Sequence, residues 1–568
     1  MFHRIWRNWR RQSQSKKASK RVVNPDEIFL DSSNLPLFNR DQFEGRIETP
    51  ISLSSLSFLK FVVFVIAFVF LGRAMYLQVV HGDLYYAKTS SNNLRKEVIF
   101  AHRGIITDRN NEPLAWNEEG STTDKFDKRI YTDISGFGSV LGYVKYPGQD
   151  SAGNFYSYAI VGQDGVEKYY DDKLSGQNGA KLTEVSVKGT VDSQSTLEPP
   201  INGDKLTLSI DAKVEKVLYQ SIAEASEKSG FKGGAGIIMD AHTGEVIASV
   251  SYPTFDSNVM TDGSNKSLIG EYLNSKRQPF LDRVSSGLYA PGSIVKPFIA
   301  LAALVENIID PNRQIFTKGY ISLPNPYDPK NPSIFKDWKD HGYVDMRKAI
   351  AVSSDVYFYI VGGGFEGQKG LGITKIDDFL TKFLFGSPVT GFFGGPGGTI
   401  PTPEWKQKTF DSDVWRIGDT YHTTIGQYGF QATPAQMVRA ASGIATEGTM
   451  VNPTIIKDEQ GLTTKVDGIT HYQYKVVKEG MKQAVTDGTA IALKIDGLDI
   501  GAKTGTAQIG VNNERVNSWV EGFFPYDNPR YVFALVLESG PTTYAVSSMR
   551  AMAETLTWIR DNEPEYVK

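Results

Sequence analysis

A run of eleven apolar residues, 61–71, is the feature that most constrains how this chain folds. Extended to residues 53–72, the segment is 20 residues long, and as a helix it spans roughly 30 Å, the thickness of the hydrocarbon layer of a bilayer. Lys60 lies within this segment, but a lysine near the end of a span can place its amine at the headgroups. The sequence therefore predicts a single transmembrane anchor over residues 51–73.

Basic residues are concentrated on one side of the apolar run. Eight of the 61 Lys and Arg residues precede Asp26, the first acidic residue: Arg4, Arg7, Arg10, Arg11, Lys16, Lys17, Lys20 and Arg21. Such a tail also suits nucleic-acid binding, but its place before an apolar run favours a topology signal, so no nucleic-acid partner is predicted. By the positive-inside rule the N-terminus is cytoplasmic and everything after Gly72 is exported. A cleaved signal peptide is the alternative, although no clear small-x-small cleavage site is present.

The composition indicates a folded protein with more than one domain. The chain has 568 residues, of which 40% are hydrophobic and 22% are charged. It has no cysteine, which excludes a disulfide framework and a thiolate nucleophile or ligand. Its seven histidines show no His-x-x-x-His spacing, so neither a metal site nor a cofactor is predicted. Covalent catalysis would need another nucleophile.

Four segments are predicted along the chain. Residues 1–50 are polar and rich in charge, Ser and Asn, which predicts a largely disordered cytoplasmic tail before the anchor at 51–73. Residues 74–205 mix short β-like runs with turn signals, which predicts a β-rich, loop-rich extracytoplasmic pedestal. A Pro-Pro-Ile-Asn-Gly-Asp linker then leads into the largest segment, residues 206–568.

The largest segment is predicted to contain an antiparallel sheet with helices. Two early strand-like runs are joined by a hairpin-like turn and should pair antiparallel, and a second pair lies far downstream. Asp211 is a candidate N-cap for the first helix. The predicted strands are 205–210, 235–239, 245–251, 518–524 and 531–538, and the predicted helices are 211–229 and 546–559.

Three short motifs in this segment carry candidate chemistry. They are Ser293-Ile294-Val295-Lys296, Ser353-Ser354-Asp355 and Lys503-Thr504-Gly505-Thr506. Each also has a plain structural explanation, namely a helix N-cap with a surface lysine, a second helix cap, and a buried strand.

Context selects Ser293 among several Ser-x-x-Lys pairs. It alone precedes a sustained helical run, 298–306, and Pro297 suits a first helical turn. The sequence therefore predicts Ser293 at a helix N-terminus with Lys296 on the same face. The rejected pairs are Ser13/Lys16, Ser57/Lys60, Ser229/Lys232 and Ser333/Lys336.

These residue types suit acyl transfer from a serine nucleophile. Lys296 is predicted to lie near the Ser293 hydroxyl and to act as general base. A free lysine has a pKa near 10.4, so this role near pH 7 requires a fall of about 3 units, which burial and the cation Lys503 can supply. Ser353 is predicted to pass a proton to the leaving amine, and Asp355 to hold the network by hydrogen bonds.

The last motif is predicted to bind substrate as well. Lys503 and the hydroxyls of Thr504 and Thr506 can hold a substrate carboxylate, and Gly505 permits close approach of the backbone to a ligand. A backbone amide of this motif can join that of Ser293 in an oxyanion hole.

In this order the three motifs resemble those of serine β-lactamases and penicillin-binding proteins. From the anchor to the C-terminus the chain is similar to class B penicillin-binding proteins, which are membrane-anchored peptidoglycan transpeptidases. Residues 103–109 and 162–167 resemble the family's pedestal signatures, and an arginine and the aspartate of the first can pair to hold the pedestal. Residues 337–342 and the aspartate at 355 resemble the elongation branch, often called penicillin-binding protein 2, whereas the division branch more often has asparagine there. Other resemblances are Tyr289-Ala290-Pro291-Gly292 before the nucleophile and Ile425-Gly426-Gln427 with Thr433-Pro434.

The resemblance implies a transpeptidase/serine β-lactamase-like α/β (α+β) sandwich, with an antiparallel sheet flanked by helices, after a β-rich pedestal and one transmembrane helix. It implies that Ser293 attacks the penultimate D-Ala of a stem peptide, releases D-Ala, and forms an acyl-enzyme that an amine from a neighbouring strand resolves. It also implies acylation by β-lactams and a single-pass location in the bacterial cell membrane. The implied partners are peptidoglycan stem peptides, β-lactams, the membrane, a SEDS-type glycosyltransferase and other cell-wall elongation proteins.

Other functions remain open at this point. A carboxypeptidase or a β-lactamase shares the acylation but transfers the acyl group to water, and no local pattern identifies the glutamate that a class A β-lactamase needs. A non-catalytic β-lactam sensor keeps Ser293 for acylation and signals through the tail, although residues 1–50 show no folded signalling domain. A bifunctional glycosyltransferase is disfavoured, because roughly 130 residues between anchor and linker are few for a second catalytic domain.

Overall fold

The structure is a computed structural model that describes residues 53–85, 94–120, 126–151, 155–185, 191–325 and 328–567. The chain divides into two units, Met1–Asn93 and Leu94–Lys568. The tail predicted at 1–50 lies outside the described residues.

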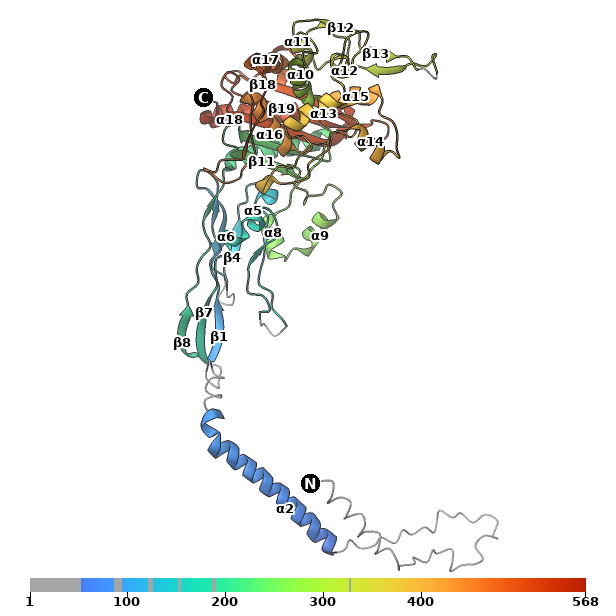
Figure 1. Cartoon of the computed structure of the whole chain (residues 1–568). Helices are drawn as coiled ribbons and strands as arrows, with labels where there is room; N and C mark the ends of the chain where they lie inside the picture. The colour runs from blue at the N-terminus through green and yellow to red at the C-terminus, as the bar shows by residue number, and fades with distance from the viewer. Residues whose placement is uncertain are drawn as a thin grey trace, which may run out of the picture. The chain divides into compact units, whose positions relative to one another are not determined.

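The first unit contains one apolar helix (Figure 1). Helix α2 (Leu53–Met75) continues into a π-helical turn, η4 (Tyr76–Val80), and its mean hydropathy reaches 2.4. None of its most apolar stretch is buried, and the helix is long enough to cross a membrane. The anchor predicted at 51–73 is therefore a helix that suits a membrane span.

Two sheets form the first part of the second unit. One is antiparallel with the order β1-β7-β8, and the other has the order β4-β3-β2-β9. The predicted strand 205–210 is shorter than expected, because only β9 pairs with β2, and Leu208 forms a bridge with Ile456 instead. The strands are β1 (Leu94–Ile99), β2 (Ile106–Thr107), β3 (Pro113–Glu118), β4 (Lys128–Tyr131), β7 (Gly179–Val185), β8 (Val191–Glu198) and β9 (Leu206–Thr207). A two-stranded pair, β5 (Val144–Lys145) and β6 (Val161–Gly162), and short helices α4 (Gly138–Leu141), α5 (Gly165–Tyr169) and α6 (Asp171–Leu174) complete this part.

The two pedestal-like segments meet in a buried ion cluster. Arg103 Nε lies 2.5 Å from Glu167 Oε2, and Arg129 Nε lies 2.8 Å from Glu167 Oε1. Nη2 of the same Arg103 guanidinium lies 2.6 Å from Asp171 Oδ1. The expected pair within residues 103–109 does not form, because the carboxylate of Asp108 accepts backbone N–H groups of Asn110, Glu112 and Ala212. The ion cluster thus connects segments about 60 residues apart in the sequence, whereas the predicted Arg–Asp pair would have joined residues within one segment.

A five-stranded antiparallel sheet organises the larger part of the unit. Its order is β11-β10-β20-β19-β18, so strands from both ends of this part pair across a long insertion. Both predicted strand pairs are confirmed. The strands are β10 (Gly233–Asp240), β11 (Val246–Tyr252), β18 (Gly501–Ile509), β19 (Arg515–Phe524) and β20 (Tyr531–Pro541).

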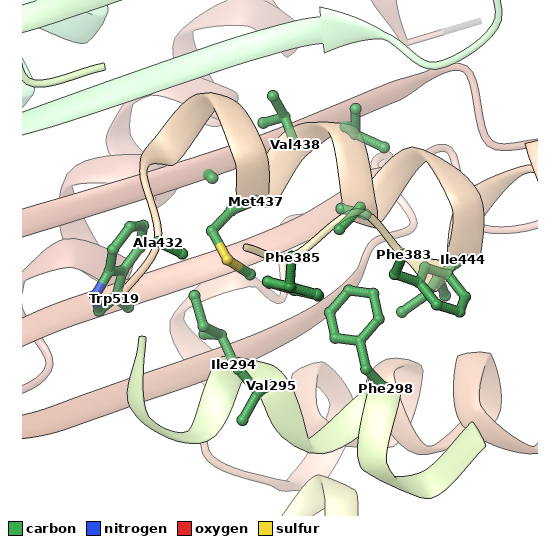
Figure 2. Close-up of a cluster of buried hydrophobic side chains, with 14 of the residues drawn as sticks. Ile294, Val295, Phe298, Phe383, Phe385, Ala432, Met437, Val438, Ile444 and Trp519 are labelled. Carbon is green, nitrogen blue, oxygen red and sulfur yellow. The ribbon is translucent and has the colours of Figure 1, made fainter. Parts of the chain in front are cut away.

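Helices cover both faces of this sheet (Figure 1). Helices α7 (Ala212–Ser229) and α18 (Ser547–Asn562) pack on one face, as the sequence predicts, and the Asp211 carboxylate caps α7 by accepting from Lys213 N and Val214 N. On the other face, α16 (Pro434–Ala445) packs on β19 and β20, and a turn at Gly292–Val295 packs on β18. Figure 2 shows part of the apolar layer there, which includes Ile294, Phe298, Met437 and Trp519.

The insertion supplies the remaining elements. Its helices are α8 (Ser257–Asp262), α9 (Lys266–Asn274), α10 (Lys296–Val305), α11 (Met346–Ala351), α12 (Asp355–Gly363), α13 (Ile373–Lys382), α14 (Pro403–Thr409), α15 (Ile417–Thr424) and α17 (His471–Asp487). Its short strands are β12 (Ile315–Thr317), β13 (Tyr320–Leu323), β14 (Ser333–Lys336), β15 (Gly342–Val344), β16 (Thr449–Val451) and β17 (Thr463–Lys465).

We predict that Glu167→Ala lowers the free energy of unfolding by about 3 to 5 kcal/mol, because it leaves two buried arginines without their shared carboxylate. Chemical denaturation of the detergent-solubilised chain measures this. Glu224→Ala is the matched control, since it removes an exposed ion pair with Lys228 and should change stability little. Equal effects of the two substitutions would refute a stabilising role for the cluster.

Candidate active site

Ser293 lies in a 3-10 turn, η5 (Gly292–Val295), that leads directly into α10. The helix is apolar and its residues from Lys296 to Leu304 are buried, so the turn is fixed by the helix that follows. Pro297 lies in the first turn, where its missing N–H sacrifices no helical bond. The predicted helix start at Ser293 is therefore confirmed, with a 3-10 turn in place of the first α-helical residues.

Backbone-to-backbone contacts hold this turn against its neighbours. Gly292 has φ +60°, and its N–H donates to Gly426 O at 3.0 Å. A Cβ on Gly426 would lie 2.2 Å from Gly292 O, and a Cβ on Gly505 would lie 2.8 Å from Pro291 O. Because only glycine fits at both positions, β18 and the loop before α16 can approach the turn closely.

The Lys296 amine joins the first motif to the second. Its Nζ donates to Asp355 Oδ1 at 2.6 Å, to Ser353 O at 2.9 Å and to Ser353 Oγ at 3.3 Å. The side chain is fully buried, and the ring of Phe358 lies 5.5 Å from Nζ. Among the described residues no hydrogen bond joins Lys296 Nζ to the Ser293 hydroxyl. In this structure the amine is therefore held by the second motif rather than by the serine three residues before it.

Ser353 occupies the centre of the three motifs. Its φ of +57° lies in the left-handed region, where a residue with a side chain is strained. Its Oγ accepts from Lys503 Nζ at 2.8 Å and lies 3.3 Å from Lys296 Nζ. One hydroxyl therefore lies between two buried amines.

The helix cap that the sequence offered for this motif is the next residue, Ser354. Its Oγ accepts from Tyr357 N at 3.2 Å and donates to Asp337 Oδ2 at 2.8 Å. Asp337 Oδ2 also accepts from Val356 N at 3.0 Å, and its side chain is fully buried. The capping and site explanations thus apply to different serines, which leaves Ser353 free to face the amines.

The third motif lies on β18 at the edge of the sheet. Lys503 is fully buried. Besides its bond to Ser353 Oγ, its Nζ donates to Thr504 O at 2.7 Å. Thr504 Oγ1 donates to Thr489 Oγ1 at 2.7 Å, and Thr506 is exposed. The alternation of the strand thus sends the lysine inward while both threonines face the cleft described below.

Burial changes the charge balance of these groups. The pKa of the Asp355 carboxyl is raised by burial, which the nearby Lys296 opposes. The pKa of the Lys503 amine is lowered well below its usual value by burial and then by the positive charge of Lys296, which Asp355 and Glu521 oppose. The lowered pKa thus belongs to Lys503, whereas the sequence analysis predicted this fall for Lys296 with Lys503 as the neighbouring cation.

A cleft of about 1020 Å³ opens beside the motifs. Ser293, Ser353, Asp355, Thr504 and Thr506 all line it, together with residues that no motif identified: Asp337, Trp338, Tyr359, His422, Gln427, Tyr428, Thr489 and Gln508. Asp337, Trp338 and Gln427 fall in segments with a family resemblance, which was the available signal for them. Lys336 of a rejected Ser-x-x-Lys pair also lines the cleft, from β14. No group of three or more potential metal ligands occurs among the described residues.

Comparison with known proteins assigns the family. Residues 234–556 match the penicillin-binding protein transpeptidase domain, and residues 119–208 match the penicillin-binding protein dimerisation domain. The chain belongs to the penicillin-binding protein transpeptidase family. Its predicted fold class and its D,D-transpeptidase activity are confirmed, as is its similarity to the penicillin-binding protein 2 branch.

Individual relatives agree with this assignment. The peptidoglycan D,D-transpeptidase MrdA of Haemophilus influenzae is 32% identical over 72% of this chain and 66% of its own length, and MrdA of Escherichia coli is 29% identical over 78% and 72%. The solved structure of Pseudomonas aeruginosa PBP2 in complex with WCK 5153 has a TM-score of 0.67 and 28% identity, covering 84% of this chain and all of that one. The Helicobacter pylori complex between PBP2 and MreC has a TM-score of 0.67 and 26% identity, covering 82% and 99%.

We predict that Gly505→Ala slows covalent labelling by a fluorescent penicillin at least about tenfold. The added Cβ would lie 2.9 Å from Ile294 Cγ2 and 3.2 Å from Ile294 N, so it displaces the turn that carries Ser293. Gly270→Ala on α9 is the control, because its Cβ meets nothing within 4 Å. A wild-type labelling rate in the Gly505 variant would contradict the close-approach argument.

Proposed function

We propose that Ser293 is the nucleophile of this transpeptidase and that Lys296, Ser353, Asp355 and Lys503 hold and move the protons around it. The observation that carries the proposal is the position of the Ser353 hydroxyl, within hydrogen-bond distance of both buried amines. A hydroxyl group can accept one hydrogen bond and donate another. The Ser353 hydroxyl can therefore pass a proton from one amine to the other.

In acylation, Ser293 Oγ attacks the carbonyl carbon of the penultimate D-Ala of a stem peptide, and its proton passes to the Lys296 amine, which acts as general base. Collapse of the tetrahedral intermediate breaks the peptide bond, and the terminal D-Ala amine leaves with a proton delivered through Ser353. The Asp355 carboxylate accepts from Lys296 throughout and keeps its Nζ aimed at the relay. The product is an ester on Ser293, and attack by an amine from a neighbouring strand reverses the proton route and forms the cross-link.

Substrate binding is proposed for β18. Thr504 and Thr506 face the cleft and supply hydroxyl donors for the terminal carboxylate of the stem peptide, while the buried Lys503 adds positive charge behind them. Gly505 lets the strand approach the turn, and a backbone amide of β18 with that of Ser293 forms the oxyanion hole. Such a donor is typically worth about 2.7 to 4 kcal/mol to the transition state.

The proposed domain division is a cytoplasmic tail at 1–50, an anchor at 51–73, a pedestal at 74–205 and a transpeptidase domain at 206–568. The basic residues before the apolar helix support a cytoplasmic N-terminus and an extracytoplasmic catalytic domain in a bacterial membrane. A membrane-impermeant fluorescent penicillin added to intact cells tests this topology: labelling is expected, and labelling only after lysis would overturn it.

The proposed partners are a SEDS-type glycosyltransferase in the membrane and other cell-wall elongation proteins. The complex of the Helicobacter pylori relative with MreC supports partners of this class. Affinity purification of the full-length chain from crosslinked membranes should recover a polytopic glycosyltransferase, and its absence would argue against this assignment.

We predict that Ser293→Ala abolishes labelling by a fluorescent penicillin, because the ester can no longer form. Ser333→Ala, in a rejected Ser-x-x-Lys pair whose lysine lines the same cleft, should label normally. Persistent labelling of the Ser293 variant would sink the nucleophile assignment.

A product assay then separates the hydrolytic and sensor alternatives. The wild-type chain, given purified peptidoglycan precursor and a glycan polymerase, should form cross-linked peptides that Ser293→Ala does not form. Tetrapeptide alone would indicate a carboxypeptidase, and labelling without any product would indicate a sensor.

A further inference from the structure

A buried carboxyl group that the proposed reaction does not use lies beside Lys503. Glu521 on β19 is the cross-strand partner of Lys503 on β18. Side chains of directly opposed residues extend on the same face of a sheet, a few ångströms apart. Both residues have no exposed surface. The carboxyl group therefore lies on the active-site face of the sheet, behind the lysine.

The surroundings of Glu521 offer it no hydrogen bond. Neither Oε1 nor Oε2 has a partner among the described residues, although both are buried. On the same face, Trp519 and Phe523 flank it along β19, and Ala534 opposes it on β20. A buried carboxyl without a donor is costly, so packing alone favours an apolar side chain here.

Few other charged groups face this carboxyl. From β20, the residues on the same face near it are Val532, Ala534 and Val536. From α16, Arg439 is already bonded to carbonyl oxygens of residues 384, 387 and 388. Lys478 of α17 lies over the Phe523 ring but donates to Glu447 Oε1 at 3.2 Å. From the turn and α10, Lys296 is bonded to Asp355. Lys503 is thus the cation directly opposite Glu521 in the strand pair, and its charge opposes the rise that burial causes in the pKa of this carboxyl.

Burial acts on the two groups in opposite directions. The pKa of the Glu521 carboxyl is raised well above its usual value by burial, and Lys503 opposes that rise. The pKa of Lys503 is lowered by burial and by Lys296, and Glu521 opposes that fall. Each group therefore favours the charged form of the other.

We propose that Glu521 is a positioning residue, whose negative charge, directly across the strand pair from Lys503, favours the charged form of the Lys503 amine against the burial that disfavours it. A charged Lys503 is a strong donor to the Ser353 Oγ and so holds that hydroxyl in place between the two amines. This inference rests on the roles proposed above for the two lysines.

The test is the pH dependence of acylation by a fluorescent penicillin in the full-length chain. In Glu521→Gln the amide keeps the shape of the side chain but cannot carry negative charge, so Lys503 loses its proton at lower pH. The alkaline limb of the rate profile should move down by about one pH unit, with a loss of about tenfold at pH 9 and a smaller loss at pH 7. An alkaline limb that coincides with the wild-type limb would overturn the proposal.

Two further variants separate charge from packing. Glu215→Gln on α7 is the matched control, since Glu215 is an equally buried glutamate whose Oε2 accepts from Ser249 N at 2.6 Å, and its profile should match the wild type. Glu521→Leu removes the unpartnered carboxyl, so its melting temperature should equal or exceed that of the wild type while its alkaline limb moves as in Glu521→Gln. Misfolding of both Glu521 variants, or a uniform loss of rate at all pH values, would assign a merely structural role and refute the inference.

The Ser293→Ala variant, measured in the same assay, separates a failure of the proposed nucleophile from a failure of the proposed role of Glu521. If that variant still labels, the proposed nucleophile is wrong. If it does not label and the Glu521→Gln profile is unchanged, only the role of Glu521 is wrong.

Discussion

The hydroxyl of Ser353, held between the amines of Lys296 and Lys503, is the contact on which the rest of this structure depends. Each of its neighbours comes from a different element: Lys296 begins α10, Asp355 begins α12, and Lys503 lies on the edge strand β18. The contact exists only when the insertion has folded back onto the sheet. The left-handed backbone of Ser353 is part of the same requirement, because the surrounding packing must outweigh that local strain.

The burial of two lysine amines side by side is the main energetic cost of this site. Two lysines with no exposed surface lie beside one hydroxyl, and a single carboxylate, that of Asp355, is bonded to one of them. Unpaired buried ammonium groups are expensive, and burial accordingly lowers the pKa of the Lys503 amine. The same penalty that would destabilise a structural lysine lowers the pKa of an amine beside the proposed proton relay. A second carboxyl behind Lys503, from Glu521, fits this balance, because it opposes the fall in the pKa of that amine.

Local signals predicted much of the framework from the sequence. The N-cap at Asp211, the hairpin of β10 and β11, the pair of β19 and β20, and the C-terminal helix all depend on residues close together in the chain. The motif serines and lysines were also found, because their order and the helix after Ser293 are visible in the sequence. The strand predicted at 205–210 was too long, since its second half pairs with a segment near residue 456 that no local pattern indicates.

What the sequence did not provide were the contacts that join distant segments. The pedestal arginine Arg103 pairs with Glu167 rather than with a nearby aspartate, and the Ser353 and Ser354 roles divide only once Asp337 is seen to hold the second serine.

Glu521 is the clearest case of a contact that only the fold reveals. In the sequence it lies within the predicted strand 518–524, and no local pattern there indicates a buried carboxyl group. The register of β18 against β19 turns that position inward and sets it opposite Lys503. The buried carboxyl group without a hydrogen bond therefore lies beside the third motif. A functional site is where such a local cost in stability is most readily offset by a gain in function.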